Sequence, residues 1–189
     1  MNIKPIETQY NGYRFRSRME ARWAVFMDTL KILYEYEPNA YQLGDLRYLP
    51  DFLLLVQDIF LEIKSPLAPA LDYEKCSRLA LATGKDVVVI SYAPTPDSDG
   101  GYLFTSYKDE FGKIVAGEDS NYLWCECPHC GRVELQFDGR ADRIKCGCPK
   151  SPHGDKGYNS ESPRILQAYQ NAKSYRFEPR ENTKALKYV

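Results

Sequence analysis

The spacing of apolar residues near the N-terminus predicts a helix. Its apolar side consists of Met19, Trp23, Phe26, Met27 and Leu30, which recur three or four positions apart. Ser17 is a suitable N-cap, so we expect the helix to begin there and to end near Lys31. Residues 32–37 then favour a short strand that Pro38 stops.

The next apolar stretch predicts a β-hairpin. Residues 53–61 contain two apolar runs separated by the polar pair Gln57-Asp58. If that pair is a two-residue loop, Asp51 faces Lys64 across the hairpin and Glu62 lies diagonally opposite Asp51. Cross-strand partners share one side of a sheet, so the three charged side chains are expected to project from the same face.

The pattern then alternates between helix and strand. Asp72 is a suitable cap for a second helix, which Gly84 closes. Residues 87–90 are continuously apolar, as in a buried strand. The segment 94–101 is rich in Pro, Gly and Asp and marks a boundary, after which residues 102–107 alternate like an exposed strand.

Asp51, Glu62 and Lys64 form a candidate metal site with a charged neighbour. Three polar side chains seldom share one face of strands this apolar unless something binds between them, because burying unpaired charge costs free energy. Carboxylate oxygens are hard ligands that suit Mg²⁺ or Mn²⁺, and an adjacent lysine can stabilise charge on a phosphate. This combination indicates phosphodiester hydrolysis. The alternative is a salt bridge at a sheet end, for which Glu-x-Lys is a common pattern.

Glu20 has two interpretations. Ser17-x-x-Glu20 is a capping box, in which Glu20 reaches back to the backbone N–H of Ser17. Its position beside the apolar stripe also turns it toward the core edge, where it is a candidate third carboxylate for the metal site.

Composition and charge narrow the class of protein. The 189 residues, 43% of them hydrophobic, suffice for one medium domain or for one domain with an appendage. Net charge is −1, but residues 121–189 carry 12 Lys/Arg against 8 Asp/Glu, whereas residues 67–120 carry 5 against 9. Arg14, Arg16 and Arg18 cluster near the N-terminus as candidate phosphate contacts. Because the chain lacks a long apolar run and a basic-then-apolar leader, we expect no membrane association and a reducing, cytoplasmic location.

The cysteines predict a structural zinc site. Five of the six lie between residues 125 and 148, and in a reducing compartment such clustering favours metal over disulfides. Cys127-Pro-His-Cys130-Gly is a zinc knuckle, whose Pro and Gly permit the tight turn that aims two thiolates at one ion. A second pair follows after 15 residues, enough for a short hairpin through residues 133–139. That pair has one intervening residue instead of two, so further candidates stay open. The predicted ligands are Cys127, Cys130, Cys146 and Cys148, with Cys125, His129 and His153 as alternatives.

The C-terminal segment predicts a docking helix and a basic tail. Ser162-Pro163 is an N-cap followed by proline in the first turn. The helix is followed by basic residues that either contact phosphates or form a solvated chain end. The predicted divisions are a core at 1–95, a linker and strand segment at 96–122, a zinc-binding module at 123–155, and this helix and tail at 156–189.

The order of these elements and motifs resembles the PD-(D/E)XK nuclease superfamily, which includes restriction endonucleases and phage resolvases. The resemblance covers roughly residues 13–92 and rests on Glu20, Pro50-Asp51 and Glu62-Ile63-Lys64. It implies an α/β fold with a restriction-endonuclease-like αβββαβ core and a mixed sheet, joined here to a small zinc-ribbon-like module. It further implies that Asp51, Glu62 and Glu20 bind Mg²⁺ or Mn²⁺ and that Lys64 acts on the nucleophile.

These observations together predict a metal-dependent endonuclease, and the resemblance favours DNA over RNA as its substrate and a bacterial or phage-infected cell as its location. A homodimer is plausible, because two nicks in a duplex need two sites, but no heptad or interface stripe in the sequence demonstrates it. One alternative is a non-catalytic adaptor that uses the nuclease fold as a scaffold and the zinc module for binding nucleic acid or protein. Another is a regulatory protein acting through a tyrosine-rich surface, since the chain contains 15 tyrosines.

Overall fold

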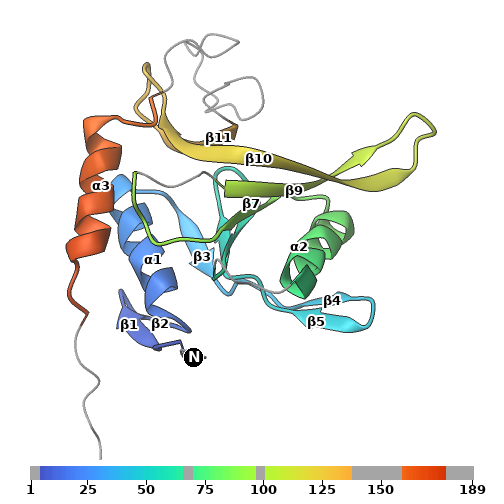
Figure 1. The fold of residues 1–189 in the computed structure, drawn as a ribbon, viewed down its shortest axis with the longest axis horizontal. Helices are drawn as coiled ribbons and strands as arrows, with labels where there is room; N and C mark the ends of the chain where they lie inside the picture. Colours follow the sequence, from blue (N-terminus) through green and yellow to red (C-terminus); the bar gives the residue numbers. More distant parts are fainter. Residues whose placement is uncertain (1–4, 66–69, 97–100, 138–158, 178–189) are drawn as a thin grey trace, which may run out of the picture.

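The computed structural model describes residues 5–65, 70–96, 101–137 and 159–177, and its fold is mixed α/β (Figure 1). Among these residues the largest sheet has seven strands in the order β11-β10-β9-β8-β7-β6-β3. β7 and β8 are parallel, whereas the other neighbours are antiparallel, so the sheet is mixed. The strands are β3 (Tyr34–Tyr36), β6 (Phe52–Leu54), β7 (Ile59–Ile63), β8 (Val87–Ile90), β9 (Gly101–Lys108), β10 (Ile114–Glu126) and β11 (Val133–Phe137).

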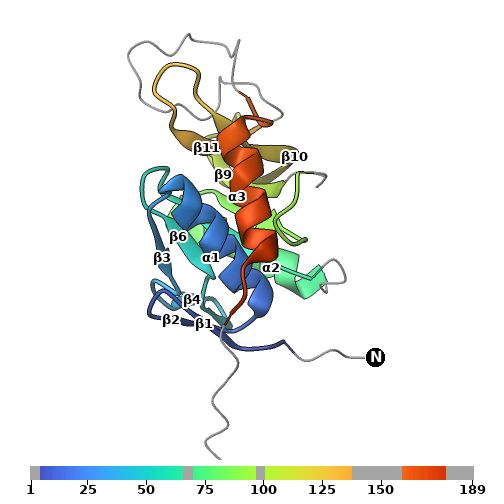
Figure 2. The same ribbon diagram turned by 90° about the vertical axis from the view of Figure 1, so that its left-hand side faces the viewer.

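The first face of the sheet is covered by α1 (Arg18–Leu30), with α3 (Pro163–Ser174) beside it (Figure 2). Both helices confirm their predicted N-caps, because the side chains of Ser17 and Ser162 accept the backbone N–H three residues on. Aromatic rings hold the pair together: the Phe26 and Tyr169 centroids lie 4.6 Å apart. Aromatic pairs of this kind bury a large apolar area and so stabilise the packing of α1 on α3.

The opposite face is covered by α2 (Ala70–Thr83). The helix closes as predicted at Gly84, whose φ of 70° suits a glycine. The predicted cap at Asp72 is wrong, because α2 begins two residues earlier. The carboxylate of Asp72 lies in the first turn and pairs with Lys75 at 2.8 Å.

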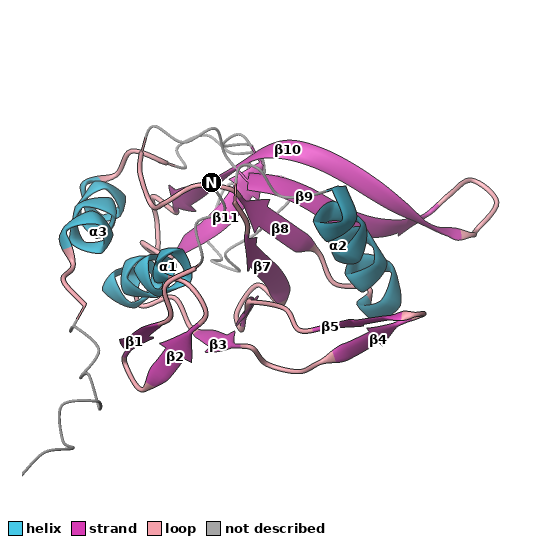
Figure 3. Cartoon of the chain, turned by 60° about the horizontal axis from the view of Figure 1, so that its bottom comes forward, coloured by secondary structure: helices cyan, strands magenta, loops and turns pink. Residues whose placement is uncertain are grey.

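Two small hairpins that the sequence analysis did not predict extend the edges of the molecule (Figure 3). β1 (Thr8–Tyr10) and β2 (Tyr13–Phe15) are joined by Asn11-Gly12, whose φ angles of 46° and 81° match a type I′ turn. β4 (Tyr41–Leu43) and β5 (Leu46–Tyr48) form the second hairpin, which packs against α2 and the nearby face of the sheet. The first hairpin leads directly into α1, and the second leads toward Asp51.

The β6–β7 hairpin is present, but its predicted register is wrong by two residues. Phe52 pairs with Leu61 and Leu54 with Ile59, so the loop spans residues 55–58 and not the Gln57-Asp58 pair alone. The longer loop closes through the Asp58 N–H, which donates to the carbonyl of Leu54 at 2.9 Å. A shift of two residues leaves every side chain on its predicted face. Asp51 now lies in register with Glu62 instead of Lys64.

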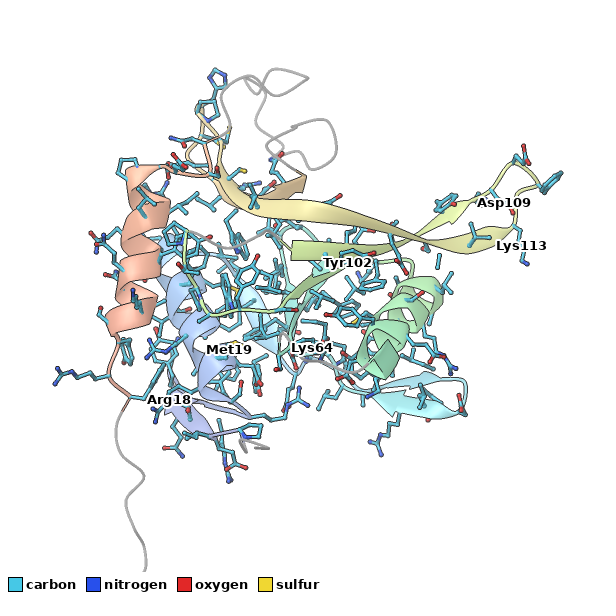
Figure 4. The ribbon with its side chains drawn as sticks, in the orientation of Figure 1. Arg18, Met19, Lys64, Tyr102, Asp109 and Lys113 are labelled. Atoms are coloured by element: carbon cyan, nitrogen blue, oxygen red, sulfur yellow. The ribbon has the colours of Figure 1, made fainter. Side chains whose placement is uncertain are left out.

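The sheet continues beyond the boundary expected near residue 96. β9 is longer than the predicted strand, and with β10 it forms a ribbon whose tip carries Asp109 and Lys113 (Figure 4). β11 confirms a strand after the knuckle and pairs with β10, while the remainder of the predicted hairpin lies outside the described residues. The division into four segments stays a prediction. Within the described residues, no helix combines the length and apolar character needed to cross a membrane.

Candidate active site

The site is built around Glu62, which β7 holds completely buried. Its Oε2 accepts hydrogen bonds from the hydroxyl of Tyr48 at 2.5 Å and from Lys64 Nζ at 2.7 Å. Its Oε1 accepts the backbone N–H of Asp51 at 3.1 Å. Partners on both oxygens offset the desolvation cost of a charge in the sheet interior.

Asp51 lies beside Glu62, just before β6. Its Oδ2 accepts the backbone N–H of Ile63 at 2.7 Å and lies 3.8 Å from Lys64 Nζ, while its Oδ1 pairs with Arg16. The two reciprocal bonds between Asp51 and the Glu62-Ile63 segment fix both carboxylates to the backbone. The structure therefore brings Asp51, Glu62 and Lys64 together, as the motif predicts.

Lys64 follows β7 and points back toward the carboxylates (Figure 4). Burial lowers the pKa of its ammonium, but the neighbouring Glu62 and Asp51 charges raise it more, so the net shift is upward. Lys64 is therefore a cation at neutral pH and can offer hydrogen bonds to an anion.

Glu20 reaches the site from α1. Its backbone N–H donates to Ser17 Oγ at 3.1 Å, and its Oε1 accepts the Ser17 hydroxyl at 2.7 Å. Its Oε2 accepts the hydroxyl of Tyr36 at 2.7 Å and the backbone N–H of Arg16 at 3.1 Å. The capping interaction is present, with Arg16 in place of Ser17 as the backbone donor. Burial and the Asp51 charge raise the pKa of Glu20. Arg16 links the two residues, because its backbone N–H binds Glu20 and its guanidinium binds Asp51.

Arg16 closes the solvent side of the site. Its Nη2 binds Asp51 Oδ1, and its Nε lies 2.8 Å from Glu37 Oε1. Of the three arginines predicted to contact phosphate, Arg16 binds a site carboxylate, whereas Arg14 pairs with Glu7. No described contact places Arg18 at the carboxylates.

Tyr48 and Cys76 complete the buried wall, and the sequence analysis missed both. The Tyr48 hydroxyl lies 4.0 Å from Cys76 Sγ, and both groups border Glu62 from β5 and α2. A signal for Tyr48 existed: residues 41–48 alternate around Gly44-Asp45, a pattern typical of a hairpin. Nothing in the sequence marked Cys76, which lies on α2.

Two adjacent buried carboxylates repel each other when both are ionised, and a cation relieves that repulsion. Burial raises the pKa of Glu62 to about 7, the Asp51 charge adds to that increase, and Lys64 opposes it. Carboxylate oxygens are hard donors that suit Mg²⁺ or Mn²⁺, which proteins commonly hold through one or two carboxylates plus substrate oxygens. Among the described residues, no group of three or more His, Cys, Asp or Glu side chains could hold a metal.

The cysteine turn shows one half of its predicted site. Cys127 is buried and Cys130 is exposed, and the Gly131 N–H donates to the Cys127 carbonyl at 2.9 Å in a tight turn. Cys125 and His129 are also described, but the part of the chain that can be described holds no three-ligand group here. Cys146, Cys148 and His153 lie outside the described residues.

Comparisons of the chain with protein family models, with curated proteins and with solved structures found no match. The function of the protein is therefore inferred from its residues and their geometry.

Proposed function

We propose that this protein is a metal-dependent nuclease that hydrolyses phosphodiester bonds, with DNA as its preferred substrate. The observation that carries the proposal is the pair of bonds that join Asp51 to the Glu62-Ile63 segment of β7, with Lys64 Nζ 2.7 Å from Glu62 Oε2. Two acidic ligands and a lysine at the end of a hairpin are the chemistry that divalent-metal hydrolysis of phosphate esters requires.

The order of elements supports the same proposal. α1, β3, β6, β7, α2 and β8 follow one another as in the αβββαβ core of the PD-(D/E)XK superfamily, which the sequence motifs resemble. The additional hairpins and β9–β11 are insertions or extensions relative to that pattern. By analogy with the family, cleavage leaves a 5′-phosphate and a 3′-hydroxyl.

In this proposal each side chain has a separate role. Asp51 and Glu62 hold Mg²⁺ or Mn²⁺, which when bound lowers the pKa of water and neutralises charge on the phosphate. Lys64 hydrogen-bonds the nucleophile or the developing phosphorane, because its raised pKa keeps it cationic. Glu20 supports the site from α1 while its cap holds the helix start.

The deciding experiment uses pure full-length protein with labelled linear, nicked, branched and single-stranded DNA, in Mg²⁺ or Mn²⁺. Wild type should cut at least one of these DNAs and should stop in excess chelator. Asp51→Asn and Glu62→Gln are nearly isosteric and should show no cutting above background, because each removes a ligand charge. Cutting by both variants at the wild-type rate would overturn the proposal.

One observation favours a second candidate, a non-catalytic adaptor. The described network pairs Asp51, Glu62 and Lys64 with protein donors and acceptors, as a structural ion-pair cluster would. An adaptor should bind nucleic acid equally well in wild type and Asp51→Asn, with or without divalent metal. Metal-dependent cutting by wild type decides between the two functions.

A further inference from the structure

Arg16 is the residue that connects the carboxylate pair to solvent. Its side chain is 51% exposed, whereas the Asp51 side chain that it binds is 3% exposed. The neighbouring charges of Asp51 and Glu20 raise its pKa despite burial, and a guanidinium is protonated at any working pH. It is therefore a permanent positive charge at the mouth of a site built for another cation.

The two carboxylate oxygens of Asp51 have different partners, and one of them is bound by Arg16. Oδ2 is held by the Ile63 N–H at 2.7 Å and faces Lys64. Oδ1 accepts a hydrogen bond from Arg16 Nη2. A divalent ion bound to Asp51 through Oδ1 would therefore compete directly with the guanidinium, both for the oxygen and by charge repulsion.

A tether limits how far Arg16 can withdraw. Arg16 Nε pairs with Glu37 Oε1 at 2.8 Å, and the Glu37 N–H donates to the Asp51 carbonyl at 2.9 Å. The Glu37 backbone has a φ of 49°, in the left-handed region. Glu37 can thus keep the guanidinium beside the site after Asp51 is released.

We propose that Arg16 is an exchangeable counter-ion of the metal site: it occupies Asp51 Oδ1 before the metal binds and contacts the substrate phosphate afterwards. This inference rests on the proposed nuclease function. The planar fork of a guanidinium matches phosphate oxygens, so a released Arg16 gains a new partner when nucleic acid is present. Metal and phosphate then increase each other's affinity, because thermodynamic linkage is reciprocal.

The test measures Mn²⁺ affinity of the full chain by electron paramagnetic resonance, without nucleic acid. Thiolates bind this hard ion poorly, so a zinc site should contribute little signal. Arg16→Gln should bind Mn²⁺ roughly tenfold more tightly than wild type, the scale of losing one competing charged hydrogen bond. Arg78→Gln is the matched control: it removes an arginine of α2 that pairs with Asp45 and Glu74 instead of with Asp51 or Glu62, and it should match wild type.

A second measurement separates exchange from a purely structural role. An uncleavable phosphorothioate oligonucleotide should raise the Mn²⁺ affinity of wild type and of Arg78→Gln, and the gain should be several-fold smaller in Arg16→Gln. Because the Arg16 side chain is half exposed and its backbone contacts are unchanged, the variant should fold.

The possible outcomes distinguish a failure of the proposed Arg16 exchange from a failure of the proposed nuclease function. Equal Mn²⁺ affinity in Arg16→Gln and wild type, together with an equal oligonucleotide gain, would overturn the exchange and leave the metal site intact. Wild-type Mn²⁺ affinity in Asp51→Asn would instead overturn the metal site and, with it, the proposed function.

Discussion

The end of the β6–β7 hairpin and the Cys127–Gly131 turn both carry metal-binding motifs, yet they differ in how their ligands meet. Asp51 lies just before β6 and Glu62 lies on the neighbouring strand β7, so one register brings them together. The knuckle contributes Cys127 and Cys130, whereas the predicted second pair, Cys146 and Cys148, lies outside the described residues. Pairing of the two hairpin strands brings the predicted ligands of the first site together. The second predicted site also needs ligands from a later segment of the chain.

This difference predicts that the two sites fail independently. The carboxylate site lies in the buried core of the sheet, whereas the knuckle lies between the end of β10 and the start of β11. Damage to one should leave the chemistry of the other measurable.

The largest expected effect concerns zinc. Cys127→Ser should abolish one tightly held equivalent of zinc, because a structural site contributes on the order of 10 kcal/mol of metal-binding free energy. Elemental analysis of protein purified without added metal measures the loss, and Cys76→Ser is the control because Cys76 lies on α2. DNA cutting should persist in Cys127→Ser. Full zinc in that variant would refute the knuckle, and lost cutting would refute the independence of the sites.

The next effect is catalytic. Lys64→Ala should slow cutting by about 10²-fold or more, the scale of one transition-state electrostatic contact, while zinc content stays at one equivalent. Single-turnover rates at saturating Mn²⁺ separate chemistry from binding. Lys75→Ala is a matched control, since Lys75 lies on α2 and pairs with Asp72. A Lys64→Ala rate within twofold of wild type would remove Lys64 from the mechanism.

A substitution at Glu20 tests whether the carboxylate site extends beyond Asp51 and Glu62. Glu20→Gln keeps hydrogen-bonding capacity for Ser17 and Tyr36 but removes the negative charge. We expect normal folding by circular dichroism and cutting slowed by roughly tenfold, a smaller loss because Glu20 acts beside the pair. A variant that cuts like wild type would limit Glu20 to the cap.

The smallest effect is a pH dependence of stability in metal-free protein. The folded pKa of Glu62, about 7, lies above its ordinary value of 4.5, so the folded state binds the proton more tightly. The stabilising contribution is complete below about pH 4.5 and is lost as the pH rises through about 7.

Thermal melts test this sign. Tm should fall by a few degrees between pH 5 and pH 8 in metal-free wild type, and Mn²⁺ should restore it most at pH 8. Glu62→Gln lacks the titrating group, so its curve should fall less over the same range. Parallel curves for the two proteins would show that Glu62 does not carry the effect.

Local sequence signals determined many of the elements. Ser17 and Ser162 cap α1 and α3 as predicted, and the apolar run at 87–90 is β8. These features depend on contacts within a few residues, which periodicity and capping preferences describe directly. The same kind of signal was available at Asn11-Gly12 and was overlooked.

The hairpin register illustrates an intermediate case. The alternation of side chains placed Asp51 and Glu62 on one face, but the loop length was wrong by two residues. The predicted faces were still right, because side-chain direction repeats every two residues. The predicted cross-strand partner of Asp51 was wrong, since direct pairing depends on the exact register.

The sequence by itself determined the carboxylate and lysine motif, the helices that flank it and the side of the hairpin from which it projects. Only the tertiary structure decided its surroundings: Arg16 meets Asp51 across 35 positions, and Tyr48 meets Glu62 across 14. It also joined β9–β11 to the same sheet. Such contacts follow from how strands and helices pack to bury apolar surface, a property of the whole chain that no local pattern contains.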